Sequence, residues 1–254
     1  MGHRWRRDDG QGASALAPRV AGRTQVECIA RNPAAVAEAP RARQPEMKTW
    51  DGAQVRAFFD ATADHRLAAL WKLLATTGLR RSEALGLRWG DLNVDETPGR
   101  LSVRQTLAYV GTRAVFDEPK TKRSRRLVTL EPETVAALRA HRARKLEERL
   151  AIGVGYRDLD LVFCGVDGQP MKPNTVSRNF DSLVRVAGLP KITLHGLRHS
   201  WASLALLDGI PSKVVAEVLG HSSTAVTENV YMHVTPGMQA DATARVAALL
   251  RRHG

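Results

Sequence analysis

The stretch LHGLRHSWASLALL, residues 194–207, decides the fold class. Its apolar residues recur at helical spacing and predict a helix over 195–207. Arg198 lies three positions after His195, so this helix presents both side chains on one face. The whole sequence after Pro173 reads as helical, with helices predicted over 173–187, 195–207, 211–219, 224–232 and 237–252.

The helical pattern also extends toward the N-terminus, where one glycine interrupts it. Apolar spacing predicts helices over 52–62, 65–77 and 132–150. Gly78 stands where a helix ends in a left-handed cap. A short helix is predicted to restart at Ser82, with Glu83 in its first turn, where a carboxylate suits the helix dipole.

The period changes from helix to strand in the middle of the chain. Apolar residues alternate from Leu101 to Tyr109 and predict a strand over 101–109, with a turn at Gly111. Further strands are predicted over 126–130 and 161–164. Between the first two, residues 120–126 hold five basic residues in seven, which we interpret as a basic hairpin. The predicted fold is α+β and mostly α, with a small three-stranded antiparallel sheet.

Charge is the first indication of function. The 254-residue chain carries 38 Lys and Arg against 26 Asp and Glu, a net charge of +12. Such a surplus favours a polyanionic partner, most commonly nucleic acid. Cys28 and Cys164 form neither a disulfide framework nor a metal-ligand spacing. Without an apolar leader or a membrane-length apolar stretch, we expect a cytoplasmic protein with no membrane association.

Residues 1–45 differ in composition from the rest. They are rich in Arg, Ala, Gly and Pro and lack periodicity, so we interpret them as a disordered leader and linker. Globular patterning begins near Trp50. The sequence therefore predicts one folded domain over 46–254.

Five short motifs carry the residues that phosphodiester chemistry needs. They are TGLRRSE at 77–83, the basic run that starts at Lys120, HGLRH at 195–199, LGHSS at 219–223 and YMH at 231–233. Cleavage without a metal needs a nucleophile, cations to neutralise the nonbridging oxygens, and an acid for the departing 5′ oxygen. Arginine suits the clamp because its planar fork gives two parallel hydrogen bonds and keeps its proton.

In order and wording these motifs resemble the tyrosine recombinases, or phage integrases, over roughly residues 46–250. The resemblance implies a helical catalytic domain that cuts and rejoins DNA in site-specific recombination or integration. It implies that Tyr231 is the nucleophile, forming a 3′-phosphotyrosyl link, and that Arg80 and Arg198 clamp the phosphate. It also implies that His195 transfers protons, that His221 hydrogen-bonds the phosphate, and that Lys120 is the general acid. Glu83 stands at the acidic position that supports this network.

Two assignments have alternatives. Lys122 lies two residues from Lys120 and competes with it as the general acid. His195 and His199 have the spacing of a metal pair, but no further ligand completes a site, so we expect no metal and no cofactor. The remaining basic residues are predicted to contact DNA backbone: Arg81, Lys122, Arg123, Arg125 and Arg126.

The family resemblance also sets expectations about partners. It implies double-stranded DNA as substrate and a homo-oligomer, a tetramer on DNA, joined through the C-terminal helix. Only residues 26–36 resemble the tail of the N-terminal core-binding domain that such enzymes carry, so we expect most of that domain to be missing. Two alternatives remain open: a catalytically silent DNA-binding remnant, and a nicking-closing activity like that of type IB topoisomerases.

Overall fold

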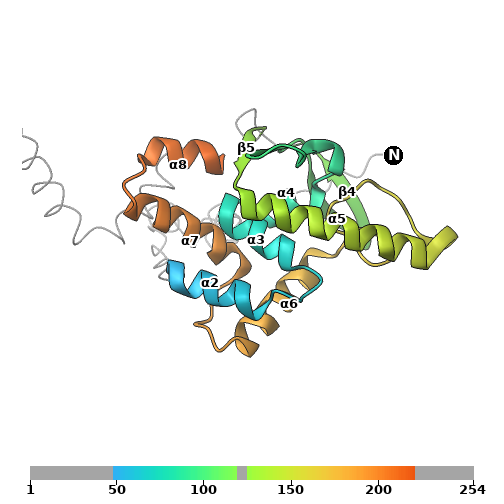
Figure 1. Ribbon diagram of the computed structural model, residues 1–254, viewed down its shortest axis with the longest axis horizontal. Coiled ribbons are helices and arrows are strands. Elements are labelled where there is room, and N and C mark those ends of the chain that lie inside the picture. The colour runs from blue at the N-terminus through green and yellow to red at the C-terminus, as the bar shows by residue number, and fades with distance from the viewer. Residues whose placement is uncertain (1–47, 119–124, 221–254) are drawn as a thin grey trace, which may run out of the picture. The chain divides into compact units, whose positions relative to one another are not determined.

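Helix α3 (Ala68–Thr77) lies at the centre of the fold, and most other helices pack around it (Figure 1). The computed structural model describes residues 48–118 and 125–220, all within one unit of the chain, 47–254. Helix α3 contacts α2 (Gly52–Ala61), α5 (Pro132–Ile152) and α7 (Leu194–Leu207). It also contacts α4 and the strand β5 (Leu127–Leu130). The remaining elements are α4 (Arg81–Gly86), α6 (Pro173–Val186), α8 (Ser212–Leu219), and the short 3₁₀ turns Trp89–Asp91 and Gly153–Gly155.

The predicted helices are present at nearly the predicted bounds, and their ends have local causes. Asp51 caps α2 by accepting from Gln54 N, and Thr193 caps α7 by accepting from Gly196 N. Gly78 ends α3 with φ of 62°, as predicted. The predicted helix over 65–77 begins later, at Ala68, and the one expected from Ser82 begins one residue earlier, at Arg81. The helices predicted over 224–232 and 237–252 lie outside the described residues.

The strands form two small antiparallel sheets. One has the order β1 (Leu92–Asn93), β2 (Gly99–Ser102), β5 (Leu127–Leu130), and the other pairs β3 (Thr106–Val110) with β4 (Arg113–Asp117) around Gly111. The α+β, mostly helical class with a three-stranded antiparallel sheet is thereby confirmed. The prediction of one strand over 101–109 is wrong, because residues 103–105 break it into β2 and β3, which belong to different sheets.

Two other strand predictions need correction. The strands that flank the basic run, β4 and β5, lie in different sheets, so they do not form the simple hairpin that the sequence indicated. Residues 161–164 form no strand. Leu161 and Cys164 each make one isolated bridge, to Arg88 and Pro170, which is too little pairing to continue a ladder.

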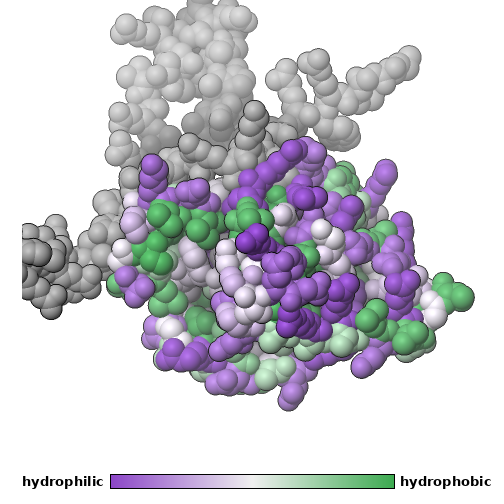
Figure 2. All heavy atoms as spheres, turned by 45° about the horizontal axis from the view of Figure 1, so that its top comes forward, coloured by the Kyte–Doolittle hydropathy of each residue, from purple (hydrophilic) through white to green (hydrophobic). Residues whose placement is uncertain are grey.

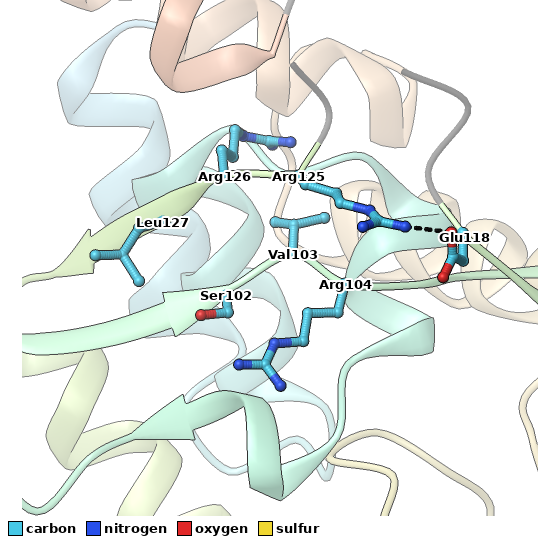
Figure 3. Close-up of a pocket in the computed structure, with 7 residues that line it drawn as sticks. All are labelled: Ser102, Val103, Arg104, Glu118, Arg125, Arg126 and Leu127. Atoms are coloured by element: carbon cyan, nitrogen blue, oxygen red, sulfur yellow. Dashed lines mark hydrogen bonds and ion pairs between the residues drawn. The ribbon is translucent and has the colours of Figure 1, made fainter. Parts of the chain in front are cut away.

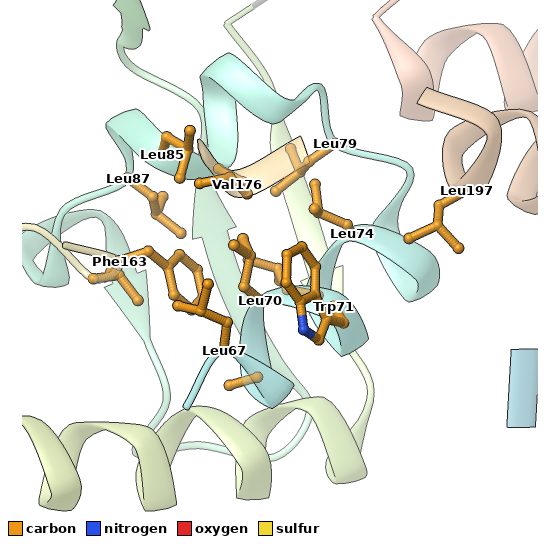
Figure 4. Packing of buried hydrophobic residues seen from close by; sticks show 14 of the residues in the cluster. Leu67, Leu70, Trp71, Leu74, Leu79, Leu85, Leu87, Phe163, Val176 and Leu197 are labelled. Carbon is orange, nitrogen blue, oxygen red and sulfur yellow. The ribbon is translucent and has the colours of Figure 1, made fainter. Parts of the chain in front are cut away.

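The core is built from leucines and a small group of aromatic rings, and Figure 4 shows part of it around Leu70 and Trp71. The rings of Trp50, Phe58 and Phe180 pack against one another with centroids 5.2–5.8 Å apart. Trp50 N also donates to Ser200 Oγ at 2.8 Å, which ties the start of the described domain to α7. Because α7 carries His195 and Arg198, this core sets the position of the HGLRH motif.

His141 on α5 is a buried histidine inside this core. Its ring is 3% exposed, its Nε2 hydrogen-bonds Val162 O at 2.8 Å, and it packs against Phe163. Burial, together with nearby Lys145 and Arg66, lowers the pKa of His141 to about 4. The folded protein therefore holds this ring neutral at neutral pH.

We predict that this histidine makes the fold acid-sensitive. Between its unfolded pKa near 6.5 and its folded pKa of about 4, only the unfolded chain takes up the proton, so stability falls as pH falls through that window. The contribution of this group between pH 7 and about 4.5 is roughly 2 kcal/mol. Urea unfolding at both pH values should show a smaller acid-induced loss in His141→Gln than in wild type. Equal losses in the two proteins would contradict the assignment.

Candidate active site

Glu83 is the hub of the candidate site. Its side chain is 2% exposed, and Arg126 donates to both of its carboxylate oxygens, at 3.1 Å and 2.9 Å. Burial raises the pKa of Glu83, but the bonds from Arg126 and Arg80 outweigh it and hold the pKa below its usual value. A carboxylate with this many donors stays ionised and fixes the groups around it.

Arg80 is oriented by this carboxylate. Its Nη1 donates to Glu83 Oε1 at 2.8 Å, and its backbone N–H donates to Glu83 Oε2 at 2.9 Å. Its Nη2 donates to Gly220 O at 3.1 Å, and its side chain remains 36% exposed. The guanidinium N–H groups of Arg80 that these contacts do not use can bind an anion without breaking the bonds to Glu83 and Gly220.

Arg198 approaches the same place from α7. Its Nη1 donates to Gly78 O at 2.5 Å and its Nη2 to Leu219 O at 2.8 Å, and the residue is only 3% exposed. A side chain at position 78 would be strained, because φ is positive and a Cβ would lie 2.5 Å from a methyl carbon of Leu219, which would have to move. Burial and the neighbouring Arg80 lower the pKa of Arg198 to about 9, so it still carries its charge at neutral pH.

His195 is exposed and lines a hollow of about 510 Å³. Arg80, Arg81, Ser177 and Asp181 line the same hollow. Partial removal of the ring from water, then His199, Arg198 and Arg80, lower the pKa of His195 to about 4. At neutral pH the ring is therefore neutral and able to accept a proton. The structure thus brings Arg80, Arg198 and His195 to one place, although Arg80 is far from the other two in sequence.

His199 packs edge-on against His195, with ring centroids 4.6 Å apart. Burial and Arg198 lower its pKa as well. Among residues 48–118 and 125–220, no three His, Cys, Asp or Glu side chains gather where they could hold a metal ion.

Arg81 faces away from Glu83 and toward α6. Its Nη1 donates to Ser177 Oγ at 2.5 Å and to Pro173 O at 3.2 Å, so this arginine joins α4 to the first turns of α6. It lines the His195 hollow at the same time. A contact of Arg81 with DNA stays a prediction.

Arg125 and Arg126 are neighbours with opposite surroundings. The Arg125 side chain is 56% exposed and paired with Glu118, whereas the Arg126 side chain is 7% exposed and turned to Glu83. Both line a second hollow of about 400 Å³ (Figure 3). Arg104, whose side chain is 70% exposed, lines it too and was not singled out from the sequence. Its only sequence signal is a basic residue in a strand-like stretch, which is too common to be specific.

The surface around these residues is polar. Figure 2 shows the side of the unit that turns β5 and α8 toward the viewer, and hydrophilic residues predominate at the centre of its described part. No helix in the described ranges is both long and apolar enough to cross a membrane.

Five predicted site residues lie outside the described residues: Lys120, Lys122, Arg123, His221 and Tyr231.

Comparison with known proteins gives consistent matches. The model of the phage integrase family matches residues 48–238. The chain is 31% identical over 214 residues to a XerC-like tyrosine recombinase of Caldanaerobacter subterraneus subsp. tengcongensis, covering 78% of this chain and 54% of that protein. It is 28% identical over 229 residues to the ICEBs1 integrase of Bacillus subtilis, covering 88% and 61%. The chain thus spans between half and two thirds of these relatives.

Solved structures agree on the fold. The Tn1549 transposon integrase bound to transposon right end DNA superposes with a TM-score of 0.70 at 23% identity, over 92% of this chain and 78% of that one. The XerA recombinase gives a TM-score of 0.60 at 25% identity, over 82% and 66%.

We predict that removing the Glu83 charge costs far more stability than removing an exposed one. Glu83→Gln removes the buried carboxylate that Arg126 and Arg80 share, which should lower the free energy of unfolding by about 3–5 kcal/mol. Glu118→Gln removes the carboxylate from an exposed pair and should cost less than about 1 kcal/mol. Urea unfolding of both variants measures the difference. Similar losses would show that the Glu83 pair is not the hub.

Proposed function

Because this chain belongs to the phage integrase family, we propose that it is a tyrosine recombinase that cuts and rejoins double-stranded DNA at specific sites. The observation that carries the proposal is the proximity of Arg80, Arg198 and His195: Arg80 shares a hollow with His195 and binds the carbonyl next to the one that Arg198 binds. Two fixed guanidinium groups beside a neutral histidine suit the attack of a nucleophile on a phosphodiester.

In the proposed reaction, the Tyr231 oxygen attacks phosphorus and the bond from phosphorus to the 5′ oxygen breaks. The neutral ring of His195 takes up the tyrosine proton, directly or through water, because its pKa of about 4 leaves it unprotonated at neutral pH. Arg80 and Arg198 neutralise the charge that grows on the nonbridging oxygens, and His221 adds a hydrogen bond. Lys120, with Lys122 as the alternative, protonates the departing 5′ oxygen.

A 5′ hydroxyl of a partner strand then attacks the 3′-phosphotyrosyl bond and releases Tyr231. The covalent intermediate keeps the bond energy of the phosphodiester, so this scheme uses neither a nucleotide cofactor nor a metal. The relatives include integrases of mobile elements. We therefore propose that the substrate sites lie at the ends of the genetic element that carries this gene.

The proposed DNA surface surrounds this centre. Arg125 and Arg104 are exposed beside one hollow and Arg81 lines the other. Together with Lys122, Arg123 and the net charge of +12, they support phosphate contacts along a duplex. Solved relatives were crystallised on DNA, including a lambda integrase dimer on a core site. By analogy, we propose that this chain assembles as a tetramer on DNA through its C-terminal helix.

The proposal predicts a covalent protein–DNA complex that depends on Tyr231. Labelled DNA from the element ends, nicked so that the cut flank diffuses away, is incubated with the full chain in EDTA and analysed on a denaturing gel. Wild type should give a retarded band and Tyr231→Phe should give none. DNA binding without a covalent band would favour the silent remnant. Relaxation of supercoiled plasmid without site preference would favour a nicking-closing enzyme.

A second prediction concerns the clamp. Arg80→Lys keeps the charge but loses the fork that holds Glu83, Gly220 and a phosphate together. Single-turnover formation of the covalent complex should slow by about 10²–10³-fold. Arg178→Lys, on the exposed face of α6, is the matched control and should leave the rate unchanged. A rate for Arg80→Lys within twofold of wild type would remove Arg80 from the clamp.

A further inference from the structure

Arg126 and its neighbour Arg125 have different surroundings. It immediately precedes β5, and its 7% exposed side chain turns into the protein, whereas that of Arg125 is 56% exposed. Figure 3 draws the two neighbours with Arg125 directed at Glu118 and Arg126 pointing elsewhere. The Arg126 guanidinium instead donates to Glu83 and to Val218 O inside the protein.

One side of the Arg126 guanidinium acts on Arg80. Its Nη1 and Nη2 hold the two oxygens of Glu83, and the same carboxylate receives the side chain and the backbone N–H of Arg80. Two-point contact fixes the rotation of the carboxylate as well as its position. The direction in which Arg80 points is therefore set by Arg126 through Glu83.

The other side of Arg126 acts on α8. Its Nε donates to Val218 O at 2.7 Å, while Arg198 donates to Leu219 O and Arg80 to Gly220 O. Three arginines thus bind three consecutive carbonyls where α8 ends. The last carbonyls of a helix lack partners within the helix and lie at its negative end, so guanidinium groups stabilise them. His221, proposed to bind the phosphate, follows Gly220 directly in the sequence.

We infer that Arg126 is a positioning residue for strand cleavage rather than a DNA contact. It joins the start of β5, the Arg80 loop through Glu83, and the end of α8, so that these three elements keep a fixed relation. This inference rests on the proposed function, since it assigns a role within that reaction.

The test separates binding from chemistry with Arg126→Lys. Lysine keeps the charge beside Glu83 but cannot hold both oxygens and Val218 O together. Affinity for a short duplex, measured against salt concentration, should keep the wild-type slope, because each lost phosphate contact lowers that slope by about 0.9. Arg125→Ala, measured for binding alone, should show that loss. At saturating protein, single-turnover formation of the covalent complex by Arg126→Lys should be about 10–100-fold slower.

A double-mutant cycle distinguishes a loss of positioning from a loss of folding. Arg126→Gln combined with Glu83→Gln removes both buried charges at once, and urea unfolding checks that it folds. If Arg126 acts through Glu83, the double variant should form the covalent complex no more slowly than Glu83→Gln alone. Rate losses that multiply would show an independent role and overturn the inference.

The outcomes are distinguishable from failure of the proposed function. A wild-type protein that forms no covalent complex would overturn the proposed function and this inference together. A wild-type complex with an unchanged rate in Arg126→Lys would overturn only the inference. So would a reduced salt slope in Arg126→Lys, because it would make Arg126 a phosphate contact.

Discussion

One buried carboxylate among three guanidinium groups is the interaction on which the site depends. Within residues 48–118 and 125–220, the Glu83 carboxylate binds Arg80 and Arg126 and lies near Arg198, so three positive charges meet one negative charge there. Burial first, and then the nearby charges of Arg80 and Arg126, lower the pKa of Arg198 to about 9. In the proposed reaction, a phosphodiester, and still more the transition state of its cleavage, brings negative charge to these guanidinium groups.

Helix ends determine where this centre can form. Gly78 closes α3 and Gly220 closes α8, both in the left-handed conformation, and Arg198 bridges the carbonyls of Gly78 and Leu219. Each helix directs its negative end at the same guanidinium. The glycines allow the close approach, as a Cβ on Gly78 would collide with Leu219. The carbonyl groups that end α3 and α8 therefore also hold Arg198 in the candidate site.

Local patterns in the sequence predicted those features of the structure that depend on interactions between residues close together in the chain. Helical periodicity, the Gly78 cap and the shared face of His195 and Arg198 depend on neighbours along the chain. The break between β2 and β3 was missed because Val103 is buried and continues the alternation, while Gln105 leaves the ladder to donate to Gly86 O. The inward turn of Arg126 was missed for a similar reason. Its partner lies 43 residues away in sequence, and nothing near Arg126 distinguishes it from Arg125.

The contacts of the clamp arginines also decide how a phosphate can bind. Arg80 and Arg198 each use two N–H groups on protein oxygens in the described structure, and a guanidinium has further donors in the same plane. A phosphate can therefore add to the existing bonds without replacing them. Donors that are already oriented need no reorganisation when charge develops, which is the condition under which electrostatic stabilisation lowers a barrier most. The bonds from Arg80 and Arg198 to the end of α8 therefore also orient these two arginines for the proposed reaction.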